Sequence, residues 1–296
     1  MGQRRARLVP PNCGYANMTR RHEIEEHLHS LQDIREIMGS MKSLSLMETR
    51  KLSRFLSSQQ RVVNSIEQAA GDFLTAYPGF LTPPPAVNEI YILIGSEQGF
   101  CGDFNQALIE TFNRLNKTKS QADVKLMAVG MKLYSSLQDH PQLIESLAGP
   151  TVGQEVDAVM TELIKSVSTL GDTLGPLSIT ALHHGHENEQ IQVTSVLPPF
   201  QNLNFQHTRY SHPPRLQLEP GLFYQTLIDY YLFAALFEMF YTSLKAEHYR
   251  RVQHLQAAID RLEQQADELG KKRNILRQEE ITEEIEVIML SAGILE

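Results

Sequence analysis

Two long stretches of helix-forming residues, one near each end, limit what this chain can fold into more than any other feature. The first runs from Arg20 to about Tyr77 without a proline, and the second begins at Pro220-Gly221 and reaches Gly270 without another proline or glycine. A helix of about 55 residues is roughly 80 Å long at a rise of 1.5 Å per residue. We therefore expect helices at residues 19–77 and 220–296. A compact domain needs no helix of that length, so both should extend beyond one.

Both stretches carry apolar residues at helical spacing. In the first stretch the apolar positions are Ile24, Leu28, Leu31, Ile34, Ile37 and Met41, followed by Phe55, Val62, Ile66, Ala69 and Phe73. In the second the steps alternate between three and four residues at Val252, Leu255, Ile259, Leu262, Ala266, Leu269, Arg273 and Leu276. A five-residue step then leads to Ile281, Ile285 and Ile288, which predicts a phase break in the seam. Stripes of this length predict a long antiparallel coiled coil in which the two terminal helices pair with each other.

The residues between the helices have the pattern of a small α/β domain. Apolar, β-branched runs predict strands at 89–95, 124–129, 177–182 and 190–196, and the last two suggest a hairpin across a polar turn at 184–189. Helices are expected at 103–115, from Met131, and at 156–167. This alternation predicts a mainly parallel, Rossmann-like sheet with an antiparallel addition, over residues 86–200. The predicted fold is therefore α/β plus a long antiparallel coiled coil, with the sheet domain inserted between the paired helices and a linker at 201–219.

The first eighteen residues form a separate segment. Arg4, Arg5 and Arg7 precede Pro10-Pro11, and no apolar run of a secretory signal follows them. We expect a disordered leader at residues 1–18, with Met18 as the natural start. A short organellar transit peptide is the alternative.

Composition excludes several classes of function. A net charge of −8 and a pI near 5.8 argue against nucleic-acid binding, which usually needs a basic surface. No stretch approaches the ~18 apolar residues of a membrane span, so membrane association is expected only through partner proteins. Cys13 and Cys101 cannot form a disulfide framework, which indicates a reducing compartment.

The loop from Gly95 to Gly102 follows a predicted strand and precedes a helix, where phosphate loops and nucleophiles are often found. It lacks the Gly-Lys-Ser/Thr ending of a P-loop and the G-x-S-x-G pattern of a hydrolase. Cys101 at the start of a helix leaves open a cysteine-dependent α/β enzyme.

Histidines suggest a metal site only weakly. His183, His184 and His186 with Glu187 fall in or next to the predicted turn, which favours a solvated loop. The histidines on the helices suggest polar faces; they are His22, His27, His29, His248 and His254. We therefore expect no catalytic residue, cofactor-binding residue, cofactor or metal ligand in this chain.

Four ordered motifs are similar to those of one family. They are Ser30–Lys42, the loop Gly95–Asn105, Ala246-Glu247-His248, and Arg277-Gln278-Glu279-Glu280-Ile281-Thr282-Glu283-Glu284-Ile285. Together with the order helix, α/β domain, helix, they make residues 20–296 resemble the γ subunit of F-type ATP synthases. Departures at Glu48, Gln98 and Asp103 indicate a divergent member.

The resemblance implies a non-catalytic, central rotor-stalk subunit that transmits torque between an ion-driven membrane ring and a catalytic hexamer. Its implied partners are the α, β and ε subunits and the ring of c subunits, at the cytoplasmic face of a bacterial plasma membrane or, alternatively, at an organellar inner membrane. The implied β-subunit contacts are Met41, Arg277, Gln278 and Thr282. The implied apolar bearing tip comprises Ile285, Ile288, Met289, Leu290 and Ile294. A coiled-coil scaffold unrelated to ATPases remains an alternative.

Overall fold

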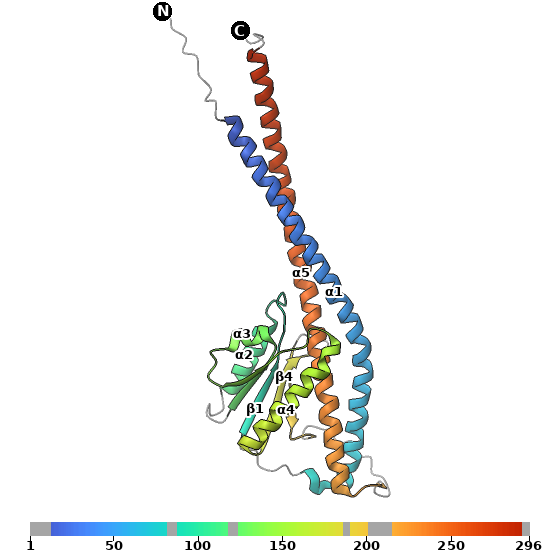
Figure 1. Cartoon of the computed structure of the whole chain (residues 1–296). Helices are drawn as coiled ribbons and strands as arrows, with labels where there is room; N and C mark the ends of the chain where they lie inside the picture. Colours follow the sequence, from blue (N-terminus) through green and yellow to red (C-terminus); the bar gives the residue numbers. More distant parts are fainter. Residues whose placement is uncertain (1–12, 82–87, 118–123, 186–189, 201–214, 292–296) are drawn as a thin grey trace, which may run out of the picture. The chain divides into compact units, whose positions relative to one another are not determined.

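A computed structural model describes the backbone of residues 13–81, 88–117, 124–185, 190–200 and 215–291 (Figure 1). In chain order the elements are α1 (Cys13–Ala76), the 3-10 turn η1 (Pro78–Leu81), β1 (Asn88–Ile94), α2 (Phe104–Asn116), β2 (Val124–Val129), α3 (Met131–Leu137), β3 (Leu143–Leu147), the 3-10 turn η2 (Gly153–Glu155), α4 (Val156–Leu174), β4 (Leu177–His184), β5 (Ile191–Leu197) and α5 (Pro220–Ser291). The predicted fold class is confirmed: two long terminal helices flank an α/β sheet.

The chain forms two compact units, and both long helices run through both of them. We call residues 43–254 the body unit, and residues 1–42 with 255–296 the coil unit. A large part of each long helix therefore belongs with the sheet, whereas the sequence predicted only that the two helices pair with each other. Helix α1 begins at Cys13, inside the segment expected to be a disordered leader, and residues 1–12 lie outside the described residues.

The sheet of the body unit has the strand order β3-β2-β1-β4-β5. The first four strands are parallel, and β5 pairs antiparallel with β4. A mainly parallel, Rossmann-like sheet with an antiparallel addition was predicted, and the structure confirms it. Strand β3 was not predicted, because its five residues, Leu-Ile-Glu-Ser-Leu, carry one β-branched side chain and form a partly exposed edge.

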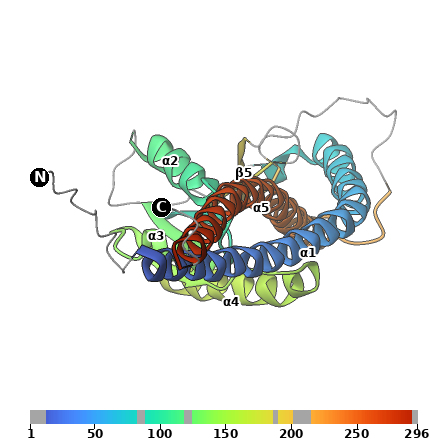
Figure 2. The same cartoon turned by 90° about the horizontal axis from the view of Figure 1, so that it is seen from above.

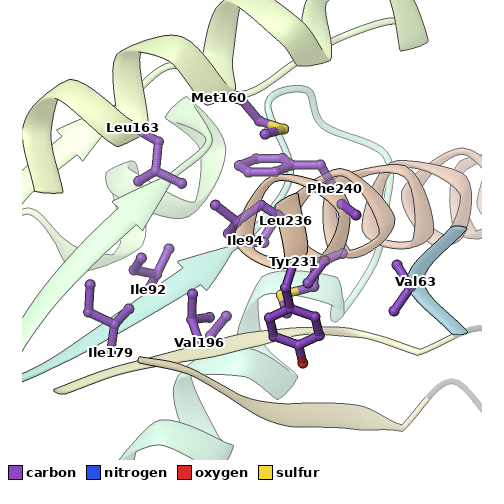
Figure 3. Close-up of a cluster of buried hydrophobic side chains, with 14 of the residues drawn as sticks. Val63, Ile92, Ile94, Met160, Leu163, Ile179, Val196, Tyr231, Leu236 and Phe240 are labelled. Carbon is purple, nitrogen blue, oxygen red and sulfur yellow. The ribbon is translucent and has the colours of Figure 1, made fainter. Parts of the chain in front are cut away.

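Alternate residues of β1 face two separate apolar cores, as the period of two in a strand requires. Tyr91 and Leu93 pack with residues of α2 and α3 on one face. Ile92 and Ile94 pack on the other face with residues of α4 and α5, among them Leu236 (Figure 3). Viewed from above, α2 and α4 lie on opposite sides of the body unit (Figure 2). The sheet is thus covered by helices on both faces.

Helix α1 packs Phe73 and Ile66 in the body unit as predicted, but at three other positions its buried stripe differs from the predicted one by one residue. Leu56 and Val63 are buried, whereas Phe55 and Val62, predicted for the seam, are about half exposed. The same holds further on, where Ala70 is buried and Ala69 is exposed. The prediction was wrong because Phe55-Leu56, Val62-Val63 and Ala69-Ala70 are adjacent apolar pairs, so the spacing alone fits either phase.

Aromatic rings hold the end of α1 in the body unit. The ring of Phe73 lies 4.9 Å from that of Tyr77, 5.4 Å from that of Phe80 and 5.1 Å from that of Phe223. The helix ends at Ala76 because Pro78 lacks the N–H that a further turn would need. The cluster fixes the turn that follows against the first residues of α5.

In the coil unit α1 and α5 run antiparallel, side by side (Figure 1). Polar contacts join them in opposite numerical order: Arg21 Nε to Glu280 Oε2 at 3.1 Å, Arg35 Nη1 to Glu263 Oε1 at 3.3 Å, and Lys42 Nζ to Gln256 Oε1 at 2.7 Å. Among the described residues of this unit, the buried hydrophobic side chains are Leu31, Leu255 and Ile259. The helix pair therefore rests on a thin apolar seam and several polar bridges.

The seam of the coil unit also corrects two predicted positions and one predicted break. Ile34 and Ile37 are 45% and 62% exposed, so they do not face α5. Beyond Leu276 the half-buried positions are Glu280, Glu283 and Met289, and the first two continue the three- and four-residue steps. The predicted phase break is wrong: Ile281, Ile285 and Ile288 lie on an exposed face of α5.

None of the helices, over the residues that the structure describes, carries an apolar run long enough to cross a membrane.

Candidate functional site

Three of the predicted β-subunit contacts form one exposed patch on α5. Arg277, Gln278 and Thr282 are all exposed, and the Thr282 hydroxyl donates a hydrogen bond to the Gln278 carbonyl at 2.8 Å. A four-residue step places Gln278 and Thr282 on the same side of a helix. Their amide, hydroxyl and guanidinium groups can bind carbonyl or carboxylate groups of another protein.

Met41 does not belong to this patch. It is half-buried on α1, next to Lys42, which bonds Gln256 of α5. About 20 residues of α5 separate Gln256 from Arg277, which is roughly 30 Å along a helix. The structure therefore divides the four predicted contacts between two levels of the coil unit.

The predicted apolar tip is exposed along α5. Ile285, Ile288 and Leu290 are each more than half exposed, and Met289 is half-buried. Ile294 lies outside the described residues. A group of exposed aliphatic side chains usually marks a surface that another protein covers.

Side-chain hydrogen bonds hold the loop after β1 in the body unit and join it to neighbouring loops. The Ser96 N–H donates to Asn105 Oδ1 at 2.9 Å, and Asn105 Nδ2 donates to Ser96 Oγ at 2.9 Å. Glu97 Oε2 accepts the N–H groups of Met131 at 2.8 Å and Gly149 at 2.7 Å, which joins the loops that follow β1, β2 and β3. These bonds satisfy the backbone N–H groups of Ser96, Met131 and Gly149.

The same loop lies tightly against α5. Gly102 has φ +63°, and a Cβ atom there would be 2.0 Å from His254 Nε2, so no other residue fits without a shift. Phe100 has φ 64° and a ring that is 55% exposed. The glycine at position 102 therefore allows the backbone of the loop to pack closely on α5.

Cys101 is a buried, free thiol. Burial, together with the nearby Glu247 carboxylate, raises its pKa to about 12. Its Sγ accepts a hydrogen bond from Arg251 Nη2 at 3.3 Å and donates to the Gly99 carbonyl at 3.3 Å. A nucleophile must be a thiolate, and this cysteine stays protonated at neutral pH. The geometry opposes the cysteine-enzyme alternative.

The centre of this region is Arg251, which is 2% exposed. Its Nε donates to the Gly99 carbonyl at 3.1 Å and its Nη1 to His248 Nδ1 at 3.1 Å. Its Nη2 bonds the Glu247 carboxylate, one turn earlier on α5. Burial raises the pKa of Glu247 to about 7 although the Arg251 guanidinium lowers it. We call Glu247, His248, Arg251 and the loop atoms they bind the Arg251 cluster.

The histidine prediction was wrong at three positions. His183 and His184 are the last two residues of β4 and are buried, because the strand continues two residues beyond its predicted end at Leu182. The ring of His184 stacks on Phe104 with centroids 3.6 Å apart, and its Nε2 bonds the Phe104 carbonyl at 2.8 Å. His248, predicted for a polar face, is buried in the Arg251 cluster.

His186 and Glu187 lie outside the described residues. Within the part of the chain that the structure describes, no group of three or more histidine, cysteine or carboxylate side chains is arranged to hold a metal ion.

Sequence reasoning named Glu247 and His248 only as a motif and missed Arg251. A signal was present: Leu244, Glu247, Arg251 and Leu255 follow steps of three and four, so two charged residues occupy core positions of an apolar stripe. A charge at a core position needs a partner that satisfies it.

Comparison with known proteins decides the family. The profile of the ATP synthase family matches residues 20–295. The chain belongs to the ATP synthase γ-chain family. It is 24% identical over 290 residues to the ATP synthase gamma chain of Azobacteroides pseudotrichonymphae, covering 91% of this chain and 97% of that one. It is 26% identical over 292 residues to that of Nitratiruptor sp., covering 88% and 97%.

Solved structures share the fold. A chain of the Euglena gracilis mitochondrial ATP synthase has a TM-score of 0.60 at 10% identity, covering 94% of this chain and 95% of that one. A chain of the Tetrahymena thermophila mitochondrial ATP synthase central stalk and c-ring has a TM-score of 0.53 at 18% identity, covering 75% and 99%.

The residues that depart from the γ-chain pattern have local partners in this chain. Asp103 Oδ1 accepts from Arg250 Nη1 at 3.4 Å, and Glu48 pairs with Lys51 at 3.7 Å. Gln98 provides a backbone N–H to the Glu247 carboxylate. Two of the three departures thus lie at the contact between the loop and α5.

Proposed function

We propose that this chain is the central rotor-stalk subunit of a rotary F-type ATP synthase, carrying torque between a membrane ring and a catalytic hexamer. The observation that carries the proposal is the unbroken helix α5. It is packed into the body unit along its first half and continues without interruption to Ser291 with an exposed surface. Membership of the γ-chain family supports the same role.

The two units suit different partners. The coil unit, with its thin seam and exposed outer face, would stand inside the hexamer of α and β subunits. The body unit would bind ε and the ring of c subunits. The chain would contribute no catalytic residue, cofactor or metal ligand of its own, and ATP chemistry would belong to the hexamer.

Within the coil unit the roles follow from side-chain chemistry. A β-subunit loop would form hydrogen bonds with Arg277, Gln278 and Thr282. Met41, level with Gln256 of α5, would pass a β-subunit lever. Ile285, Ile288, Met289, Leu290 and Ile294 would turn in a hydrophobic sleeve. Apolar contacts are non-directional, so such a bearing resists rotation less than hydrogen bonds would.

We place the complex at the cytoplasmic face of a bacterial plasma membrane, with the chain bound to it through partners. The matched relatives of Azobacteroides and Nitratiruptor support this location. An organellar inner membrane is the alternative.

Reconstitution with purified α and β subunits tests the function. ATP hydrolysis is expected to require this chain, and a bead attached to the body unit should rotate when ATP is added. If α and β subunits neither bind the chain nor change their activity with it, the proposal is wrong. Cys101→Ser should leave rotation intact, whereas a thiol enzyme would lose its activity.

The contact patch has its own test in the same assay. Arg277→Ala and Gln278→Ala should each lower the rate of hydrolysis, because bonds to the β subunit are lost. Arg114→Ala, an exposed arginine of α2 in the body unit, is the matched control. Equal effects of Arg277→Ala and Arg114→Ala would contradict the assigned contact.

A further inference from the structure

The Arg251 cluster joins two separate parts of the body unit by hydrogen bonds. Glu247, His248 and Arg251 lie on α5, whereas the acceptors at Gly99 and Cys101 lie on the loop after β1. The guanidinium thus bonds atoms on both sides of one packing surface. Each of these bonds fixes the direction as well as the distance between the helix and the loop.

Further bonds join the same stretch of α5 to the same edge of the sheet. Ser243 Oγ donates to the carbonyl of Ile94, the last residue of β1, at 3.0 Å. His248 Nε2 bonds the Thr151 carbonyl, beyond β3, at 3.2 Å. The joined stretch ends at His254, against Gly102, and the coil unit begins at the next residue, Leu255. Together these bonds and contacts hold the stretch of α5 from Ser243 to His254, at the end of the body unit's share of the helix.

The rest of the α5 contact in the body unit is mostly apolar, for example at Leu236, Met239 and Phe240. Apolar packing resists a large turn of α5 about its axis, because Leu236 and Phe240 would leave the core, but it is non-directional and fixes a small turn less sharply than hydrogen bonds do. A buried, multiply bonded guanidinium resists such a turn, because a small rotation would break several bonds and leave a buried charge unsatisfied.

We propose that the Arg251 cluster is the joint that prevents α5 from turning against the body unit when torque passes between them. Arg251 and Glu247 are positioning residues in this role: they contact no substrate, and they act by fixing the shaft to the sheet. The inference rests on the proposed rotor function and names the place where the body unit holds the rotor helix.

The test uses the complete complex, reconstituted in vesicles, with the double variant Glu247→Gln/Arg251→Met. Removing both charges avoids leaving one buried and unpaired. ATP hydrolysis without an opposing ion gradient is expected to stay within about twofold of wild type. The number of ions pumped per ATP against a gradient is expected to fall about fivefold, because a slipping joint fails under load.

Three further variants separate a joint from ordinary stabilisation. Arg250→Met removes a more exposed pair, with Asp103, across the same contact, so the ratio of pumping to hydrolysis should fall much less than in the double variant. Arg251→Lys keeps the charge but loses the planar fork, so its ratio should lie between those of wild type and the double variant. Ser243→Ala removes a neighbouring bond between α5 and the end of β1, with little risk to folding, and should lower the ratio slightly.

The outcomes are distinct. A double variant that pumps as well as wild type overturns the joint, and so does one that loses hydrolysis and pumping in equal proportion. If the wild-type chain supports neither hydrolysis nor pumping, the proposed function fails, and the joint fails with it.

Discussion

The body unit and the coil unit share two helices but are stabilised in different ways. In the body unit both faces of a five-stranded sheet are covered, and Phe104, Phe112 and Phe240 are fully buried. In the coil unit Leu31, Leu255 and Ile259 are the buried hydrophobic side chains among the described residues, and exposed ion pairs supplement them. The same helix is thus a core element in one unit and mostly surface in the other.

This difference shows that the length of a helix does not determine how firmly it is held. Burial of apolar area is the main stabilising contribution in folding. The body unit should therefore account for most of the free energy of unfolding, while the coil unit should open locally at lower cost. A partner that covers the exposed face of the coil unit would supply the burial that the chain lacks.

The largest expected effect is the loss of a fully buried ring in the body unit. Phe240→Ala removes a side chain with no exposed area, and we expect the free energy of unfolding to fall by about 3–5 kcal/mol. Phe233→Ala, on the same helix but half exposed, is the control and should cost much less. Chemical denaturation followed by circular dichroism measures both, and equal losses would contradict the assigned core.

Acid should weaken the body unit selectively. Burial lowers the pKa values of His183, His184 and His248 to about 4. The unfolded chain takes up these protons near pH 6.5, so the stability that each neutral histidine contributes is complete above that pH and is lost as pH falls through about 4. The expected slope is on the order of 1 kcal/mol per pH unit for each histidine.

The titration of Glu247 changes the stability of the body unit with pH in the direction opposite to that of the histidines. Its raised pKa of about 7 gives stability that is complete below pH 4.5 and is lost as pH rises through 7. Thermal unfolding at pH 7, 6 and 5 measures the balance. His248→Gln should make the melting temperature fall less between pH 6 and pH 5. His22→Gln, on an exposed face of the coil unit, should not have this effect. A melting temperature that is equal at pH 7 and pH 5 would contradict this account.

Neighbouring valines test which stripe of α1 faces the core. Val63 is 6% exposed and Val62 is 48% exposed. Val63→Ala should lower the free energy of unfolding by about 2 kcal/mol, and Val62→Ala should change it by well under half as much. The two variants delete the same atoms from adjacent positions. A larger loss from Val62→Ala would restore the phase predicted from the sequence.

In the coil unit a buried residue should matter locally rather than globally. Ile259→Ala should increase amide hydrogen exchange about tenfold in α5 after Leu255 and in α1 before Lys42, and should leave the body unit unchanged. Ile275→Ala, at a 55% exposed position, is the control. If exchange rises throughout the chain, the two units unfold together and the comparison fails.

The smallest effect is expected for an exposed ion pair. The side chains of Arg35 and Glu263 are 47% and 54% exposed. Arg35→Ala should change stability by less than about 1 kcal/mol, and the change should vanish in high salt because exposed charges are screened. A loss that persists in high salt would show that the bridge contributes more than a surface pair does.

Periodicity was enough to predict the long helices, the parallel sheet and its antiparallel addition. It could not choose between Phe55 and Leu56, because adjacent apolar residues fit two phases equally well. It placed His183 and His184 in a turn, because histidines are polar, although both are buried, with ring nitrogens bonded to backbone carbonyls and the His184 ring stacked on Phe104. Arg251 was missed for a related reason: its partners at Gly99 and Cys101 are about 150 residues away in sequence, and only the fold brings them together.

The bond from Ser243 to the end of β1 has a consequence for how this sheet should be understood. Parallel sheets of this strand order usually hold a small molecule beyond the carboxyl end of the first strand, where the order of strands reverses. Here Ser243, Glu247 and Arg251 of α5 occupy the end of β1 and its loop, and Phe104 stacks on His184 at the end of β4. The helix takes the place that a cofactor has in related folds. In this chain the carboxyl edge of the sheet therefore binds a helix of the same polypeptide.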